Sequence, residues 1–314
     1  MLKRKLWPLL YGIVLAAFTA YVLLDAFVIP RSYSSVQKIA ASASSAQSET
    51  DSTSSGSAGD SSEAESAASA EAAVTDSTYE DGDTSVTITQ YRESDTTVYV
   101  ADITLSSASA LKTALAQNTY GKNITQTTSA IAAANNAILA INGDYYGTRN
   151  GYVIRNGVLY RSSSAGSDQQ DLVVYQDGSF AVVSEGDATA QELLDDGAWQ
   201  VLSFGPALVE NGAVAVSTNE EVDRAKTSNP RTAIGVIDDL HYVFVVADGR
   251  TSQSAGLSLY ELAEFMQSLG VKTAYNLDGG GSSTMVFNGS VVNQPTTNGN
   301  TIKERAVSDI VYIG

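Results

Sequence analysis

The stretch of sequence with the clearest chemical content follows a short apolar run and reads NLDGGGSST over residues 276–284. It places a carboxylate, three glycines and two serines in succession: Asp278, Gly279, Gly280, Gly281, Ser282 and Ser283. Glycine adopts positive φ and lets a ligand approach the backbone closely, and successive amides in such a turn can bind an anion. No lysine follows the last glycine and a strand is predicted next, so neither a P-loop nor a dinucleotide fingerprint fits. We interpret the stretch as a functional loop; the alternative is a glycine-rich bulge between two strands.

A second polar stretch, INGDYYG over residues 141–147, follows a short run that we predict to be a buried strand. Asn142 and Asp144 would lie at the edge of a sheet, where polar groups can converge on a ligand. Tyr145 and its neighbour Tyr146 could stack on a sugar ring. The alternative interpretation is an Asn-Gly turn followed by two core tyrosines.

Three arginines lie near the ends of predicted strands. Arg231 stands at the entry to one strand, Arg250 follows Asp248 just past another, and Arg305 precedes the final strand. Arginine is the side chain best suited to holding phosphate through two parallel hydrogen bonds. The formal net charge of −17 disfavours general binding of nucleic acid or other polyanions. A phosphate must therefore be held locally, by a few arginines or backbone amides.

The composition removes several other chemistries. The chain has no cysteine, so it has no disulfide and no thiolate nucleophile. Its single histidine, His241, lies in a predicted strand, which argues against a Ser-His-Asp triad. A carboxylate site for Mg²⁺ or Ca²⁺ stays open but has no support, and we predict no metal and no cofactor. Asp278, Asp144 and Asp248 remain as the candidate acid, base or nucleophile.

Pattern and turn chemistry predict the elements that position these residues. Residues 86–91, 97–105, 137–141, 240–247 and 271–277 are predicted strands, and 124–136 and 258–269 are predicted helices. Asn-Gly and Asp-Gly pairs between β-rich runs suit hairpin turns. Ser258 and Glu261 form a capping box, and Gly270 ends that helix. We therefore predict an α+β fold, with a mixed or largely antiparallel β-sheet core and a few packed helices.

The N-terminal part predicts a membrane attachment. Residues 6–24 carry no charge and follow three basic residues, which is typical of a transmembrane helix with its basic end in the cytoplasm. Residues 1–31 are thus expected to be a cytoplasmic tip and signal-anchor, and 32–83 a disordered Ser/Ala/acidic linker. Residues 84–314 would form the catalytic domain, outside the cytoplasm of a single-pass bacterial membrane protein. A cleaved signal peptide is the alternative.

In this order the motifs resemble the phosphodiester glycosidase family. The matching stretches are residues 140–146, 204–206, 229–235, 248–250, 276–285 and 305–309. The resemblance implies an enzyme that hydrolyses a sugar-1-phosphodiester, releasing the sugar and leaving a phosphomonoester. On a bacterial surface the substrate would be a glycosyl-phosphate polymer or oligosaccharide, such as a cell-wall glycopolymer or an exopolysaccharide.

Our hypothesis assigns the phosphate to Arg231, Arg305 and the glycine amides, with Arg250 as a further candidate. Asn142 and Tyr145 would hold the sugar, and the separation of two carboxylates would decide between retention and inversion. Three alternatives stay open. The first is a phosphodiesterase or phosphotransferase that acts at phosphorus, and the second is a non-catalytic module that binds wall polysaccharide. The third is a scaffold for polysaccharide assembly. The membrane, reached through the N-terminal helix, is the only other partner expected, and nucleic acid is not.

Overall fold

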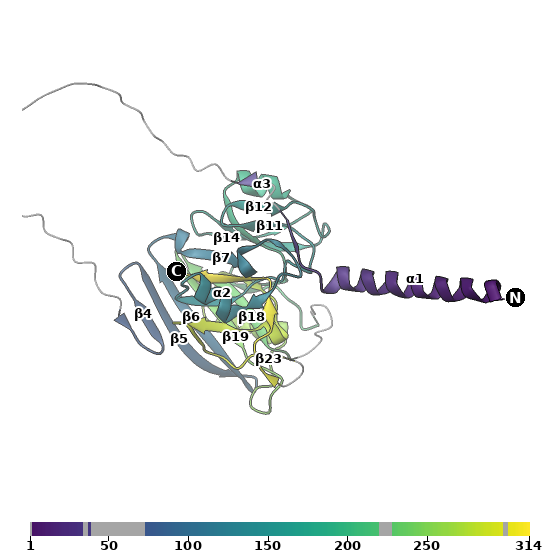
Figure 1. Cartoon of the computed structure of the whole chain (residues 1–314). Coiled ribbons are helices and arrows are strands. Elements are labelled where there is room, and N and C mark those ends of the chain that lie inside the picture. The colour runs from purple at the N-terminus through teal and green to yellow at the C-terminus, as the bar shows by residue number, and fades with distance from the viewer. Residues whose placement is uncertain (1, 34–36, 39–72, 220–227, 298–300) are drawn as a thin grey trace, which may run out of the picture.

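The computed structural model describes residues 2–33, 37–38, 73–219, 228–297 and 301–314 (Figure 1). Most of the predicted linker therefore lies outside the described residues. The helices of the described part are α1 (Leu2–Phe27), α2 (Thr128–Ala134), α3 (Ala190–Asp195) and α4 (Leu259–Ser268), with 3₁₀ turns η1 (Ala108–Ala110), η2 (Ala116–Asn118) and η3 (Gly280–Ser282).

A nine-stranded sheet forms the centre of the domain. In spatial order its strands are β17 (Ala213–Val214), β16 (Ala207–Glu210), β20 (Thr273–Asn276), β18 (Arg231–Asp238), β19 (His241–Ala247), β6 (Thr96–Leu105), β5 (Thr84–Glu93), β4 (Thr78–Glu80) and β3 (Ala73–Val74). Every described ladder in it is antiparallel. Strands β3 and β4 extend the sheet N-terminally of residue 84.

Two further sheets pack beside it. The five-stranded sheet is β22 (Ser290–Val291), β21 (Met285–Phe287), β10 (Leu139–Asn142), β26 (Asp309–Ile313) and β7 (Leu111–Leu115). The six-stranded sheet is β14 (Phe180–Ser184), β13 (Gln170–Tyr175), β15 (Ala198–Leu202), β11 (Val153–Arg155), β12 (Val158–Arg161) and β2 (Gln37–Lys38). Short ladders join β1 (Arg31–Ser32) to β8 (Gly121–Lys122), β9 (Gln126–Thr127) to β25 (Ala306–Val307), and β23 (Thr296–Thr297) to β24 (Thr301–Ile302).

The core is layered, with the sheets facing one another and helices on their outer faces. The largest cluster of buried side chains joins the nine-stranded sheet to the other two, through residues such as Phe244, Ile141 and Leu172. A second cluster fills the space between the other face of the nine-stranded sheet and α4. Smaller clusters seat α2 on the five-stranded sheet and α3 on the six-stranded sheet. The predicted α+β fold with a largely antiparallel core is thus confirmed.

The local predictions agree with the structure where a specific side-chain interaction sets them. Helix α4 has the predicted capping box, in which Ser258 accepts from the Glu261 amide and Glu261 accepts from Ser258. The Asn156-Gly157 turn has positive φ at both residues, as a primed hairpin turn requires. The predicted helix over 124–136 is shorter, because residues 126–127 form β9 and Thr127 caps α2.

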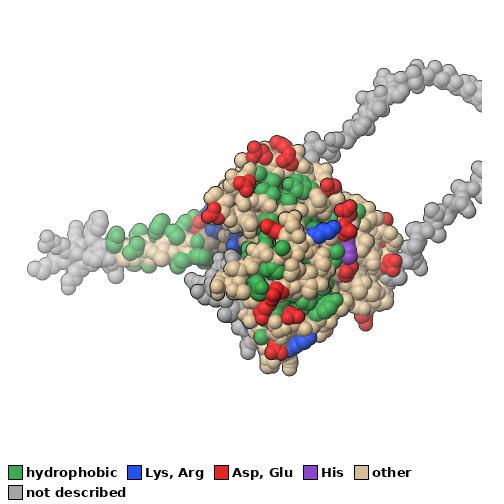
Figure 2. Space-filling model, turned by 180° about the vertical axis from the view of Figure 1, so that it is seen from behind, with side chains coloured by type: hydrophobic (Ala, Val, Ile, Leu, Met, Phe, Trp, Pro, Cys, Tyr) green, Lys and Arg blue, Asp and Glu red, His purple; other side chains and the backbone are tan. Residues whose placement is uncertain are grey.

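One helix of the described part, α1, is long and apolar enough to cross a membrane, and it lies at the N-terminus. Its side chains from Leu10 onward are largely exposed, and Figure 2 shows green apolar side chains along the projecting helix. Figure 1 shows α1 running away from the domain, which it joins through β1. The helix suits either a signal-anchor or a signal sequence.

Candidate active site

The glycine-rich loop lies where three chain segments meet. It begins at the end of β20, between β16 and β18 in the nine-stranded sheet. The amide of Asp278 donates to the carbonyl of Gly143, past the end of β10, at 3.2 Å. The amide of Gly280 donates to the carbonyl of Pro230, before β18, at 2.8 Å. Segments that lie 135 and 48 residues before Asp278 in the chain are thereby bound to one turn.

The carboxylate of Asp278 is buried and held through one oxygen. Its Oδ2 accepts from Ser282 Oγ at 2.5 Å and from Arg305 Nη2 at 2.9 Å. Its Oδ1 has no hydrogen-bond partner among the described residues. Burial raises the pKa of Asp278, while the charge of Arg305 and the hydrogen bond from Ser282 oppose that rise. One oxygen is thus fixed by two hydrogen bonds.

Three arginines surround the glycine turn. A Cβ built on Gly280 would lie 2.9 Å from Arg250 Nη2, and one built on Gly279 would lie 3.9 Å from Arg231 Cδ. Burial lowers the pKa of Arg231 to about 10, with the charge of Arg250 adding to the effect. Burial likewise lowers the pKa of Arg250, and the charge of Arg305 adds to that. The positive charges of these neighbouring guanidinium groups favour an anion between them.

A fourth arginine, Arg149, was not predicted from the sequence. Its guanidinium carbon lies 4.2 Å from the ring centroid of Phe204, and its positive charge opposes the rise in the pKa of Asp278. It follows β10 in a turn, where its amide donates to the carbonyl of Tyr145 at 3.3 Å. Its position depends on the packing of this loop against the Phe204-Gly205-Pro206 stretch, whose Phe204 ring lies under the guanidinium. That contact joins distant segments and has no local sequence pattern.

Asp144 lies in a buried ionic cluster beneath the site. Its Oδ1 accepts from Arg155 Nη2 at 2.7 Å, and its Oδ2 accepts from the Ser203 amide at 2.8 Å. Arg155 also donates to Asp309 Oδ2, at 3.1 Å from Nε and 2.9 Å from Nη2. Burial, with the charge of Asp144 beside it, raises the pKa of Asp309. Arg155 and Asp309 were not assigned roles from the sequence, and they tie Asp144 into the protein interior.

Asn142 is fully buried under the glycine-rich loop. Its Oδ1 accepts from Thr232 Oγ1 at 2.8 Å and from the Thr284 amide at 3.2 Å. Its Nδ2 donates to the carbonyl of Asp278 at 2.6 Å. The side chain predicted to hold a sugar is therefore used inside the protein, where it joins β10, β18 and the two ends of the loop.

Asp248 supports the loop from its other side. Its Oδ1 accepts from Asn293 Nδ2 at 3.0 Å and from the Gln294 amide at 2.9 Å. Asn293 in turn donates to the carbonyl of Ser283 and accepts from the amide of Met285, at 3.0 and 2.9 Å. Burial raises the pKa of Asp248. The carboxylate fixes the chain that follows β22 against the end of the loop.

Tyr145 stands beside the arginines with its ring half-buried. The guanidinium carbon of Arg305 lies 5.8 Å from the ring centroid, and Tyr145 has φ +61°. The aromatic face of Tyr145 thus lies next to a guanidinium group. Ser283 is buried nearby, and its hydroxyl has no hydrogen-bond partner within the described part of the chain.

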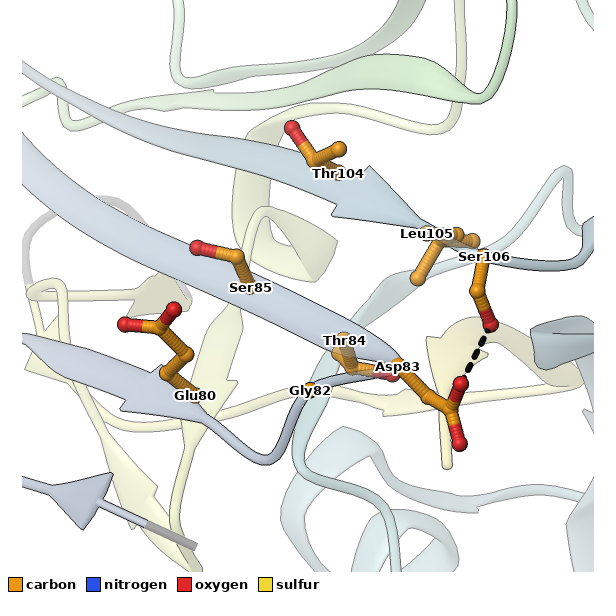
Figure 3. A pocket seen from close by; sticks show the side chains of 8 residues that line it. All are labelled: Glu80, Gly82, Asp83, Thr84, Ser85, Thr104, Leu105 and Ser106. Carbon is orange, nitrogen blue, oxygen red and sulfur yellow. Dashed lines mark hydrogen bonds between the residues drawn. The ribbon is translucent and has the colours of Figure 1, made fainter. Parts of the chain in front are cut away.

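The structure thus gathers Asp278, Gly279, Gly280, Gly281, Ser282, Tyr145, Arg231, Arg250 and Arg305 at one place, and sets Asn142, Asp144 and Asp248 behind it. A separate polar surface pocket lies at the far end of β5 and β6, where Asp83 accepts from Ser106 Oγ at 2.8 Å (Figure 3). Within the described ranges, no group of three or more acidic, histidine or cysteine side chains could hold a metal ion.

This fold and site define the class of protein. The model of the phosphodiester glycosidase family matches residues 135–314, more than half of the chain, and the chain belongs to that family.

Its relatives are enzymes from animals and a bacterial protein without an assigned activity. The mouse and human N-acetylglucosamine-1-phosphodiester alpha-N-acetylglucosaminidases are 31% identical over 176 and 182 residues. These alignments cover 50% and 52% of this chain and 33% and 35% of the animal proteins. The prophage-derived uncharacterized protein YomE of Bacillus subtilis is 29% identical over 199 residues, which cover 62% of this chain and 30% of YomE. The chain therefore spans about a third of the length of these relatives.

Solved structures share the fold. The catalytic domain of the zebrafish N-acetylglucosamine-1-phosphodiester alpha-N-acetylglucosaminidase, auto-inhibited by its pro-peptide, superposes with a TM-score of 0.58 at 20% identity. The match covers 73% of this chain and 82% of the zebrafish domain. A hypothetical protein from Synechocystis superposes with a TM-score of 0.52 at 16% identity, over 74% of this chain and 62% of that protein.

Proposed function

We propose that this protein is a glycosidase that hydrolyses a sugar-1-phosphodiester. The observation that carries the proposal is the convergence of Arg231, Arg250 and Arg305 on the glycine turn that follows Asp278. A phosphodiester bears one negative charge, and the site offers it guanidinium groups and backbone amides beside a carboxylate. The animal relatives, named for cleavage of an N-acetylglucosamine-1-phosphodiester, support the same reaction and suggest N-acetylglucosamine as the sugar.

In the proposed reaction water adds to C1 of the sugar and the bond from C1 to the phosphate oxygen breaks. The electron pair of that bond leaves with the phosphate, which gains negative charge as it becomes a monoester. Arginines placed around the phosphate stabilise that charge most strongly when it is fully developed. The proton of the attacking water passes to Asp278 Oδ1, the oxygen that makes no hydrogen bond within the described part of the chain. Because phosphate is a good leaving group, the arginine clamp replaces much of the work of a general acid.

The other two predicted carboxylates have positioning roles in this proposal. Asp144 is bound to Arg155 and to the Ser203 amide, and Asp248 to Asn293 and Gln294. Neither is presented to the phosphate as Asp278 is. Asn142 also acts on the loop through its own hydrogen bonds. Tyr145 stacks on the sugar, and Arg149 beside Phe204 adds a fourth positive charge near Asp278.

The test is release of sugar from methyl N-acetylglucosamine-1-phosphate and related sugar-1-phosphodiesters. Asp278→Asn keeps the size of the side chain and should lower kcat by at least about 10³-fold, because it removes the proton acceptor. Asp239→Asn, at an exposed position in the β18–β19 turn, is the matched control and should behave as wild type. Normal turnover in Asp278→Asn would remove this residue from the mechanism.

Hydrolysis in ¹⁸O-labelled water separates the proposal from cleavage at phosphorus. Label in the released sugar shows attack at C1, while label in the phosphate shows a phosphodiesterase or phosphotransferase. Tight binding of the esters by wild type without any turnover would instead identify a non-catalytic binding module.

We further propose that α1 is a retained signal-anchor, that the domain lies outside the cytoplasm, and that the substrate belongs to the cell surface. The charge pattern supports this orientation: Lys3, Arg4 and Lys5 precede the apolar run. A glycosyl-phosphate polymer or oligosaccharide of a bacterial wall or exopolysaccharide fits both the location and the site.

A further inference from the structure

The domain makes direct contact with the end of α1. Asn123 Nδ2 donates to the carbonyl of Ala26, in the last turn of the helix, at 3.4 Å and to that of Ile29 at 3.1 Å. The guanidinium of Arg31 hydrogen-bonds Asp25. If α1 spans a membrane, the loop that carries Asn123 therefore lies at the headgroup level.

The chain leaving α1 then pairs with the domain at once. Arg31 and Ser32 form β1, in register with Lys122 and Gly121 of β8. The ladder is continued by the amide of Tyr33, which donates to the carbonyl of Tyr120 at 2.8 Å. The sequence predicted a free linker from residue 32, whereas this pairing begins one residue earlier. Lys122, opposite Arg31 in this ladder, places a second basic side chain where α1 meets the domain, as suits a surface facing lipid phosphates.

Strand β8 is also close to the active site. A Cβ built on Gly147 would lie 3.5 Å from the carbonyl oxygen of Gly121 and 2.6 Å from Ser308 Oγ. Gly147 is two residues beyond Tyr145, whose ring faces Arg305. The ring of Tyr120 stacks on that of Tyr146 with centroids 5.1 Å apart. The loop that presents Tyr145 to the site thus rests on the strand that holds β1.

These contacts limit how far the site stands from the membrane. The path from Ala26 through Asn123, Gly121 and Gly147 to Tyr145 covers at most about 30 Å, given the reach of the chain per residue and the two contacts that it crosses. A flexible linker of some fifty residues would instead allow a root-mean-square separation of about 40 Å, with wide excursions. The site is therefore held at a short and fixed height.

We propose that β1 fixes the domain at the outer face of the membrane that α1 spans. We propose further that the substrate of the enzyme is a sugar-1-phosphodiester whose other ester group is a lipid in the outer leaflet of that membrane. This rests on the proposed function. Water adds to C1 of the sugar, the C1–O bond breaks, and the lipid keeps a phosphomonoester. The sugar leaves into solution, while both enzyme and product lipid stay in the membrane. A soluble wall polymer would have no need of a site held at this height.

The docking of β1 is tested by a cross-link, since the chain has no cysteine of its own. Arg31→Cys with Lys122→Cys joins a directly opposed antiparallel pair, a separation that a disulfide can span. When the full-length protein is in membranes, mild oxidation should form the cross-link in most of the molecules. Arg31→Cys with Lys272→Cys, on the far side of the sheet, should give none. Absence of the first cross-link would overturn the docking.

Gly121→Ala is the variant that should release β1. Its Cβ would meet the carbonyl oxygen of Arg31 at 1.8 Å, which no side-chain movement can relieve, whereas its contact with the tip of Ile124 can relax. Thr125→Ala, exposed and four residues away, is the matched control. The cross-link should fall at least several-fold in Gly121→Ala and stay unchanged in Thr125→Ala.

The substrate is tested with two esters of N-acetylglucosamine-1-phosphate, the hexadecyl ester in phosphatidylglycerol vesicles and the methyl ester in solution. Full-length protein should cleave the hexadecyl ester at least tenfold faster when the enzyme and this ester share a vesicle than when they occupy separate vesicles. Gly121→Ala should lose most of that advantage. The advantage is the ratio of the rates on shared and separate vesicles, so an effect of the substitution on the loop of Tyr145 cancels.

The outcomes separate the two proposals. Equal rates on shared and separate vesicles, or an advantage that survives loss of the cross-link, would overturn the lipid-linked substrate while leaving the glycosidase intact. If neither ester is cleaved, the proposed function fails and the substrate assignment with it, and the cross-link still decides whether β1 docks.

Discussion

At the scale of single residues, Asp278 is subject to two opposing effects. Burial favours its protonated form, whereas Arg305, 2.9 Å from Oδ2, favours the carboxylate. In the proposed mechanism only the carboxylate can accept the proton of the attacking water. The pKa of this one side chain should therefore set the acidic limit of activity.

Replacing Arg305 by Gln tests this balance. Loss of the positive charge should raise the pKa of Asp278 further, because Arg305 favours the carboxylate form. Because a raised pKa protonates the carboxylate at higher pH, the acidic limb of the kcat profile should move to higher pH. Arg305→Lys keeps the charge and should leave the limb close to wild type. A limb that moves to lower pH, or that moves equally in both variants, would contradict the proton-acceptor role.

The sequence could not identify the polar residues that hydrogen-bond one another inside the protein. Arg155 ends an apolar strand and could equally have faced solvent, and only the meeting of β11 with Asp144 and Asp309 makes it a buried partner. Asn142 and Asp144 share a motif with Tyr145, yet only Tyr145 is placed beside Arg305. Residue types predicted a phosphate site, but which polar side chains point outward depends on contacts between distant strands.

At the scale of elements, the turn after β20 determines the site. Gly280 has φ +62°, a conformation that costs an L-residue about 1–2 kcal/mol, and it leaves room for the guanidinium of Arg250. The sequence predicted a glycine-rich loop between two strands at this position, and the structure has one between β20 and β21. Helix α4 was equally predictable from its capping box. Helix α3 was not located, although Thr189 and Glu192 form the same kind of box around it.

Gly280→Ala should therefore damage the site beyond its effect on the backbone. The new Cβ lies 2.9 Å from Arg250 Nη2 and should displace that guanidinium, lowering kcat/KM by about tenfold, the effect of weakening one charged hydrogen bond. Gly289→Ala is a close control, since Gly289 also has positive φ, +75°, but has open space around its Cβ.

Thermal unfolding of the two variants completes this comparison. Both should lose similar stability, because both impose the same kind of backbone strain, while only Gly280→Ala should lose activity. Equal activity losses in the two would mean that strain alone, and not the position of Arg250, explains the defect.

At the scale of the whole molecule, the arginines of the site carry positive charge, whereas the chain as a whole is acidic. The net charge is −17, and Figure 2 shows acidic side chains spread over the face in view. A protein with this field does not gather polyanions from solution. Substrate must be delivered by proximity, and attachment to the surface that carries the substrate supplies it.

Retention of α1 is the last requirement of this arrangement. Its final turn contacts Asn123, and Arg31 just beyond it belongs to β1, so cleavage near residue 27 would separate the domain from its membrane contact. We expect the protein to sediment with membranes, to resist extraction by alkaline carbonate, and to keep its full mass of 32.9 kDa. Protease added outside intact cells should digest the domain and spare α1. A shorter chain released into the medium would identify α1 as a signal sequence and free the enzyme to act on soluble polymers.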